Sequence, residues 1–203
     1  MSFFEKARES LILEIKSTSK SSLDFDVFVP KNLKFGDLSS NVFLKNEGIS
    51  LCDFTLPAYF SSYYIESGFL NVFVDRSFSN EIIDEILREE GQIKFDVPRF
   101  YDFEPYGAEN EKFYHFHLLS RINKLTGIHY AKKTELSCVD DSKWELIWSI
   151  ARQSCANDKE NIKKLCRGIE KFYKRLNSFD GESLTILKAC GVVLEKALCS
   201  YYG

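Results

Sequence analysis

Cationic side chains at helical spacing are the strongest candidates for binding chemistry in this sequence. Four of them step by 3, 4 and 3 residues: Lys164, Arg167, Lys171 and Lys174. This spacing places them on one stripe of a helix, where they can contact the phosphates of a nucleic-acid backbone. The alternative is an ordinary solvated helix face, because Glu160 and Glu170 dilute the positive charge.

A second group of candidates lies in residues 67–78, SGFLNVFVDRSF. An exposed Phe69 could stack on a splayed base while the amide of Asn71 reads the edge of that base, as in the recognition of single-stranded RNA. Arg76, just past the strand, could reach a phosphate. The alternatives are that Phe69 packs in a sheet, that Asn71 bonds to a loop and that Arg76 is a solvated end.

Residue types that carry catalysis or bind metals are sparse. The only histidines are His115, His117 and His129. The first two stand two positions apart and therefore point to different faces of a helix. The six cysteines show no paired ligand spacing, and no nucleophile motif of the GxSxG type is present. The sequence predicts no catalytic residue, no metal site and no cofactor.

Charge is distributed unevenly along the 203 residues, whose net charge is −3. Residues 1–95 carry 10 basic and 15 acidic side chains, whereas residues 96–203 carry 17 basic and 15 acidic. A nucleic-acid face is therefore expected in the second half.

The charged residues near Met1 argue against a signal peptide, and no apolar run reaches a membrane span of about 20 residues. A cytoplasmic protein without a membrane partner is expected.

The first 91 residues predict an α+β domain with a small antiparallel sheet and helices. Alternating apolar residues favour strands at 23–29 and 68–74. A Gly-Asp turn at Gly36 and Asp37 comes between the two strands. Helices are expected at residues 2–16, 50–64 (interrupted at Pro57) and 77–90.

The remainder predicts a linker and an all-α helical bundle. Residues 92–110 contain Pro98, Pro105 and Gly107 without a sustained period, which is typical of a linker. From residue 111 the pattern is helical to residue 203, and Gly127 could cap the first helix. Further helices are expected at residues 141–156, 161–176 and 183–202, the second with the clearest apolar stripe.

Two motifs in the first domain carry a resemblance. Phe35–Lys45 reads FGDLSSNVFLK, and the strand that begins at Gly68 reads GFLNVF. Their order resembles the additional N-terminal domain of arginyl-tRNA synthetases, in which an FGDY..N turn precedes a GF(I/L)NF strand. That domain grips the tRNA elbow at the D-arm. The resemblance implies that Phe69, Asn71 and Arg76 contact the D-arm.

The C-terminal region resembles the DALR-type anticodon-binding domain of the same family. The segment FHLLSRINKL is similar to its opening helix, where a Tyr and an Arg stand four residues apart. In this register His117 replaces the Tyr and Arg121 keeps the Arg. The last two predicted helices resemble the end of that domain. The resemblance implies anticodon-arm or phosphate contact through His117, Arg121 and the cationic stripe.

The catalytic domain that separates these regions in the family is missing from the sequence. No HIGH-type turn is present, and KSTSKS at residues 16–21 is only superficially similar to the KMSKS loop. The resemblance therefore implies a non-catalytic tRNA-binding protein, with arginine-accepting tRNA the species suggested. It would hold tRNA or act as an adaptor for a synthetase or a tRNA-modifying enzyme. The alternative is a protein-interaction scaffold that has lost RNA binding.

Overall fold

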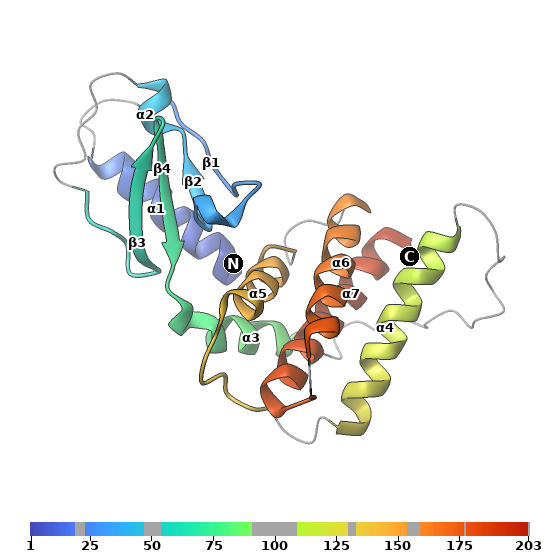
Figure 1. Ribbon diagram of the computed structural model, residues 1–203. Helices are drawn as coiled ribbons and strands as arrows, with labels where there is room; N and C mark the ends of the chain where they lie inside the picture. The colour runs from blue at the N-terminus through green and yellow to red at the C-terminus, as the bar shows by residue number, and fades with distance from the viewer. Residues whose placement is uncertain are drawn as a thin grey trace. The chain divides into compact units, whose positions relative to one another are not determined.

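The computed structural model describes residues 1–18, 23–46, 54–90, 109–129, 133–153, 159–176 and 178–202. Contacts within the chain divide it into two compact units, Met1–Phe78 and Ser79–Gly203. We call the first the sheet unit and the second the helical unit, and each is described by itself (Figure 1). The chain thus combines a small antiparallel sheet with helices, and the described part of its C-terminal region is helical.

The sheet unit is built on a four-stranded sheet with the order β1-β2-β4-β3, in which every neighbouring pair is antiparallel. Strand β4 therefore lies inside the sheet, while β1 and β3 lie at its ends. The elements are α1 (Phe3–Thr18), β1 (Val27–Phe28), η1 (Leu33–Phe35), β2 (Leu38–Ser40), α2 (Val42–Lys45), β3 (Phe60–Glu66), β4 (Phe69–Val74) and η2 (Arg76–Phe78).

Helix α1 and one face of the sheet supply the core of this unit. The helix buries side chains spaced by four residues: Phe3, Ala7, Leu11 and Ile15. Strand β4 buries alternate aliphatic residues, which share one face of a strand: Leu70, Val72 and Val74. Helix α1 lies beside the sheet (Figure 1), and the guanidinium of Arg8 donates to the carbonyl of Val27 at 3.1 Å. Asn71 consequently belongs to the other face of β4.

The turn at Phe35, Gly36 and Asp37 (the FGD turn) joins β2 to β4 through hydrogen bonds. Gly36 has a φ of +104°, which side-chain-bearing residues rarely adopt. The N–H of Asp37 donates to the carbonyl of Val72 at 2.9 Å, and the carboxylate of Asp37 accepts from the N–H of Val74 at 2.9 Å. The turn therefore sets the pairing of two strands and holds Ser39 opposite Asn71.

The expected helix at residues 50–64 is wrong where the structure describes it. Residues 60–66 form strand β3, which pairs with β4 through a hairpin at Ser67 and Gly68. Both turn residues have positive φ, 51° and 82°, a geometry that suits the twist of a two-residue hairpin. Residues 50–53 of the expected helix lie outside the described residues.

The expected strand at residues 23–29 is shorter than predicted. Only Val27 and Phe28 pair with β2. The backbone N–H groups of Asp24 and Asp26 donate to the side-chain amides of Asn46 and Asn41. Side chains thus take the place of strand partners over this stretch. The expected strand at 68–74 is confirmed as β4.

The helical unit gathers around its last helix. The elements are α3 (Ser79–Leu87), α4 (Glu109–His129), α5 (Asp141–Gln153), α6 (Lys159–Arg175) and α7 (Gly181–Tyr202). Helix α7 contacts each of the other four. Its side chains are buried on nearly every face from Leu184 to Leu194, as expected of a helix enclosed by others. Among the described residues, no helix has the length and apolarity needed to span a bilayer.

Helix α3 packs within the helical unit, so the contacts divide the chain at a different place from the predicted boundary at residue 91. The helix packs on α5 and α7. Asn80 exchanges two hydrogen bonds with the backbone of Leu136. Lys196 pairs with Glu89 at 2.8 Å. Of the predicted linker, residues 92–108 lie outside the described residues, and 109–110 begin α4.

Two helix starts in this unit, those of α5 and α7, are capped by aspartate side chains. The carboxylate of Asp140 accepts from the N–H of Lys143 at 2.8 Å, and that of Asp180 accepts from the N–H of Ser183 at 2.7 Å. A side-chain acceptor at this position satisfies a backbone donor that has no helical partner. The expected cap at Gly127 is wrong, because α4 continues to His129.

Candidate nucleic-acid interfaces

The sheet unit carries a hollow of about 510 Å³ whose lining includes Asn71. Three phenyl rings contribute to it, those of Phe28, Phe35 and Phe69. Phe28 and Phe69 pack edge to face with their centroids 6.1 Å apart. Phe28 is 38% and Phe35 40% exposed, so both rings present surface to solvent. We call this site, with Ser39 and Asn71, the sheet hollow.

Asn71 is held in the floor of the sheet hollow. Its side chain is buried, and its Oδ1 accepts a hydrogen bond from the hydroxyl of Ser39 at 2.6 Å. Its Nδ2 donates only to the carbonyl of Phe69, at a long 3.5 Å, among the residues that the structure describes. Asn71 therefore bonds to the sheet and still has donor capacity for a ligand in the hollow.

Charge at the sheet hollow comes from few residues. Lys31 and Glu66 contribute to the lining, and the ammonium of Lys34 lies 4.8 Å from the centre of the Phe35 ring. A cation over a ring both orients the ring and adds positive potential beside it. Arg76 is not part of this site. It is exposed in η2, beyond the far end of β4 from Phe69.

The four predicted cations of α6 form an exposed stripe, which we call the α6 stripe: Lys164, Arg167, Lys171 and Lys174. The opposite side of the helix buries the expected apolar residues Ile162, Leu165, Ile169 and Phe172. Within the stripe, Lys171 pairs with Glu145 at 2.8 Å and Lys164 approaches Glu160 at 4.0 Å. Arg167 and Lys174 make no ion pair with any described residue, which leaves both available to an anion.

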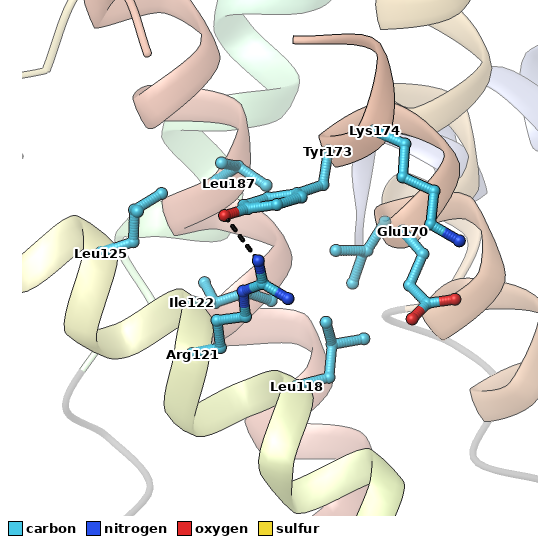
Figure 2. A pocket seen from close by; sticks show the side chains of 9 residues that line it. Leu118, Arg121, Ile122, Leu125, Glu170, Tyr173, Lys174 and Leu187 are labelled. Carbon is cyan, nitrogen blue, oxygen red and sulfur yellow. Dashed lines mark hydrogen bonds between the residues drawn. The ribbon is translucent and has the colours of Figure 1, made fainter. Parts of the chain in front are cut away.

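Arg121 is held against Tyr173, which sequence reasoning did not single out. Its guanidinium lies 4.3 Å from the centre of the Tyr173 ring and donates to the phenol oxygen at 2.9 Å (Figure 2). Phe179, 39% exposed, packs on Tyr173 with ring centres 5.4 Å apart. The structure therefore brings Arg121 of α4 together with Lys174 of α6 beside an aromatic pair.

His117 lies on the exposed side of α4, while His115 is 1% exposed. The two histidines face different sides of the helix, as their spacing predicts. The imidazole of His117 stacks on the ring of Phe113 with a centroid distance of 5.9 Å. The residue thus presents a flat surface of the kind on which a base can stack.

Several residues of these surfaces were missed at the level of sequence. Phe28 and Phe35 come from segments more than thirty residues before Phe69, and only the folded sheet places them together. One signal was available for Phe28, because it alternates with Asp24 and Asp26 and so stands on the polar side of its segment. Tyr173 and Phe179 carried no comparable signal.

Comparison of the chain with protein-family models, with curated proteins and with solved structures gives no match. Its function must therefore be inferred from the two surfaces themselves. One combines exposed rings with a buried amide, and the other combines exposed cations with a stacked Arg121–Tyr173 pair. Exposed rings can stack on a flat group, and exposed cations can pair with an anion.

Proposed function

We propose that this chain is a non-catalytic tRNA-binding protein that takes an unpaired base into the sheet hollow. The observation that supports this most is the placement of Phe28, Phe35 and Phe69 around the buried amide of Asn71. Stacking on aromatic rings contributes about 1–3 kcal/mol per base in single-strand binding. Such stacking needs an unstacked base, which RNA offers in its loops.

Asn71 adds selectivity to this stacking. Its Nδ2 can donate to a base carbonyl, while its Oδ1 is already engaged by Ser39. A site that offers one donor favours a base with a carbonyl on the facing edge and disfavours an amino group there. The bond between Ser39 and Asn71 fixes the amide in one orientation, so the donor is positioned before the base arrives.

The α6 stripe would contact the RNA backbone. Arg167 and Lys174 are exposed and make no ion pair with a described residue, so a phosphate can approach them without breaking an existing pair. The net charge of −3 disfavours general polyanion binding, which fits recognition of a folded RNA better than coating of any strand. The motifs resembling arginyl-tRNA synthetase suggest arginine-accepting tRNA, held for or delivered to a synthetase or a tRNA-modifying enzyme.

The test is retention of total tRNA by the purified full chain at about 50 and 200 mM salt, followed by sequencing of the retained species. We expect selective retention that weakens steeply as salt rises. The variant Phe35→Ala should weaken binding by about tenfold, because one stacking surface is lost. Tyr63→Ala is the matched control, since Tyr63 is 42% exposed in the same unit but does not line the sheet hollow.

Absence of binding at the lower salt concentration would reject RNA recognition by the chain alone. A second candidate, a protein-interaction scaffold, would then take precedence. It is favoured by strand β3, at one end of the sheet, where Tyr63 and Ile65 are 42% and 49% exposed. Exposed apolar side chains on such a strand suit the addition of a partner segment.

Equal losses of tRNA affinity in Phe35→Ala and Tyr63→Ala would also count against a base in the sheet hollow.

A further inference from the structure

A second cavity lies in the helical unit, between α4, α6 and α7, and has a volume of about 140 Å³ (Figure 2). Its inner wall is aliphatic and buried: Leu118, Ile122, Ile169 and Leu187. Its more exposed members are polar: Arg121, Tyr173, Lys174 and Glu170. We call it the α4–α6 pocket. An apolar interior with a charged mouth fits a ligand that has an apolar body and an ionised end.

The volume limits the size of the apolar body. Engineered protein cavities of about 150 Å³ lined by aliphatic and aromatic side chains take up a molecule the size of benzene. The α4–α6 pocket therefore has room for one ring or one short branched chain. Leu125, half-buried at its side, completes the apolar wall.

The mouth determines the charge of the ligand. Arg121 is fixed by its hydrogen bond to Tyr173 and by its stacking on that ring, so its remaining N–H groups are oriented in advance. Lys174 supplies a second cation that makes no ion pair with a described residue. Glu170 is the one acidic residue among the described residues of the lining, so the two cations outnumber it. The mouth can therefore accept an anion.

We propose that the α4–α6 pocket binds a small apolar carboxylate, with the apolar group inside and the carboxylate paired with Arg121 and Lys174. A nucleobase would fit less well, because its polar edges would meet the aliphatic wall without partners. The α4–α6 pocket is a different surface from the sheet hollow. The pocket shares Lys174 with the α6 stripe, but the ligand is titrated in the absence of RNA, so the outcome is separate from that of the proposed function.

The test uses two probes of the same shape, 4-methylpentanoate and its neutral amide, titrated into the full chain and followed by methyl NMR. We expect shifts of Leu118, Ile122 and Leu187 methyl signals, and an affinity for the acid about tenfold higher than for the amide. Arg121→Gln should remove that preference and leave the affinity for the amide unchanged. Lys124→Gln, which changes an exposed cation of the same helix as Arg121, α4, but outside the lining, should leave both affinities unchanged.

An acetylated tripeptide ending in leucine distinguishes the two sources of such a ligand. Tighter binding of the peptide would assign the pocket to a chain end, and binding of the free acid alone would assign it to a small molecule. The proposal fails if neither probe shifts these methyl signals at millimolar concentration, or if acid and amide bind equally. It also fails if an RNA oligonucleotide shifts them and the acid does not. These titrations of the unmodified chain decide the question even if a variant folds poorly.

Discussion

The backbone conformation and close surroundings of Gly36 disfavour any residue that carries a side chain. Its φ is +104°, and a Cβ built there would lie 2.8 Å from the carbonyl oxygen of Val72, an atom of the backbone that cannot turn aside. The same turn places Asp37 where it bonds to both Val72 and Val74. The residue thus determines how β2 meets β4, and through them the distance between Ser39 and Asn71.

We therefore expect Gly36→Ala to destabilise the sheet unit by at least about 2 kcal/mol. The measurement is hydrogen exchange of the amides of Val72 and Val74, which should lose protection. The control is Gly168→Ala, whose new Cβ would meet Leu146 Cδ1 at 3.6 Å, an ordinary contact inside α6. That change should stabilise the helical unit by about 0.5–1 kcal/mol, since alanine favours a helix interior. Unchanged exchange in Gly36→Ala would contradict the role given to the turn.

At the scale of elements, a polar clasp joins the first turns of α5 and α7. Glu182 accepts hydrogen bonds from the ammonium of Lys143 and, at 2.9 and 2.6 Å, from the N–H and hydroxyl of Ser137. The side chains of Lys143 and Glu182 are 18% and 17% exposed. Burial alone would raise the pKa of Glu182, but these hydrogen bonds outweigh it and lower the pKa from 4.5 to about 2.

A carboxylate with a lowered pKa stabilises the fold above its ordinary pKa, and that stabilisation is lost as the pH falls from about 4.5 towards 2. We expect Glu182→Gln to lower the free energy of unfolding by about 2 kcal/mol at pH 7. The difference from the unmodified chain should shrink across that pH range. Urea unfolding followed by the fluorescence of Trp144 and Trp148 measures it, because both tryptophans lie in α5.

Glu160→Gln provides the comparison for the clasp. Glu160 is 64% exposed and stands 4.0 Å from Lys164 on the same helix, so its loss should change stability by less than about 0.5 kcal/mol. A deficit in Glu182→Gln that stayed constant from pH 7 to pH 2 would show that the variant acts through packing and not through charge.

Which elements could be predicted depends on how local their causes are. Helices α6 and α7 were anticipated because their apolar residues repeat over several turns within one segment. Strand β3 was not predicted, because Ser61 and Ser62 interrupt any alternation of apolar and polar residues. Its extended conformation depends instead on its pairing with β4. The placement of α3 among α5 and α7 likewise depends on contacts far along the chain.

The candidate sites divide in the same way. Asn71 could be found from its motif, and the cations of the α6 stripe from their spacing. Their surroundings could not: Ser39 fixes the amide from a neighbouring strand, and Tyr173 fixes Arg121 from another helix. A single segment specifies which side chains are presented, whereas the fold decides which of them share a surface.

At the scale of the whole molecule, the charge of the second half must act through particular side chains if the chain binds RNA. Residues 96–203 carry 17 basic and 15 acidic side chains, so their net charge of +2 gives only a weak general attraction. Within the α6 stripe, Lys164 and Lys171 already face Glu160 and Glu145. Phosphates should therefore be held mainly by Arg167 and Lys174.

This distinction can be measured from the salt dependence of tRNA binding. In a plot of log affinity against log salt concentration, the double variant Arg167→Gln/Lys174→Gln should have a slope that is less steep by about 1.4. Each lost phosphate contact on a single strand removes about 0.7 from the slope, because one fewer contact then releases counterions. Lys164→Gln with Lys171→Gln removes the same formal charge but should change the slope by less than half as much. Phe35→Ala should lower affinity at every salt concentration with the slope unchanged, because stacking releases no counterions. Equal slopes for the two double variants would mean that RNA responds to the net field of the chain and not to the two unpaired cations.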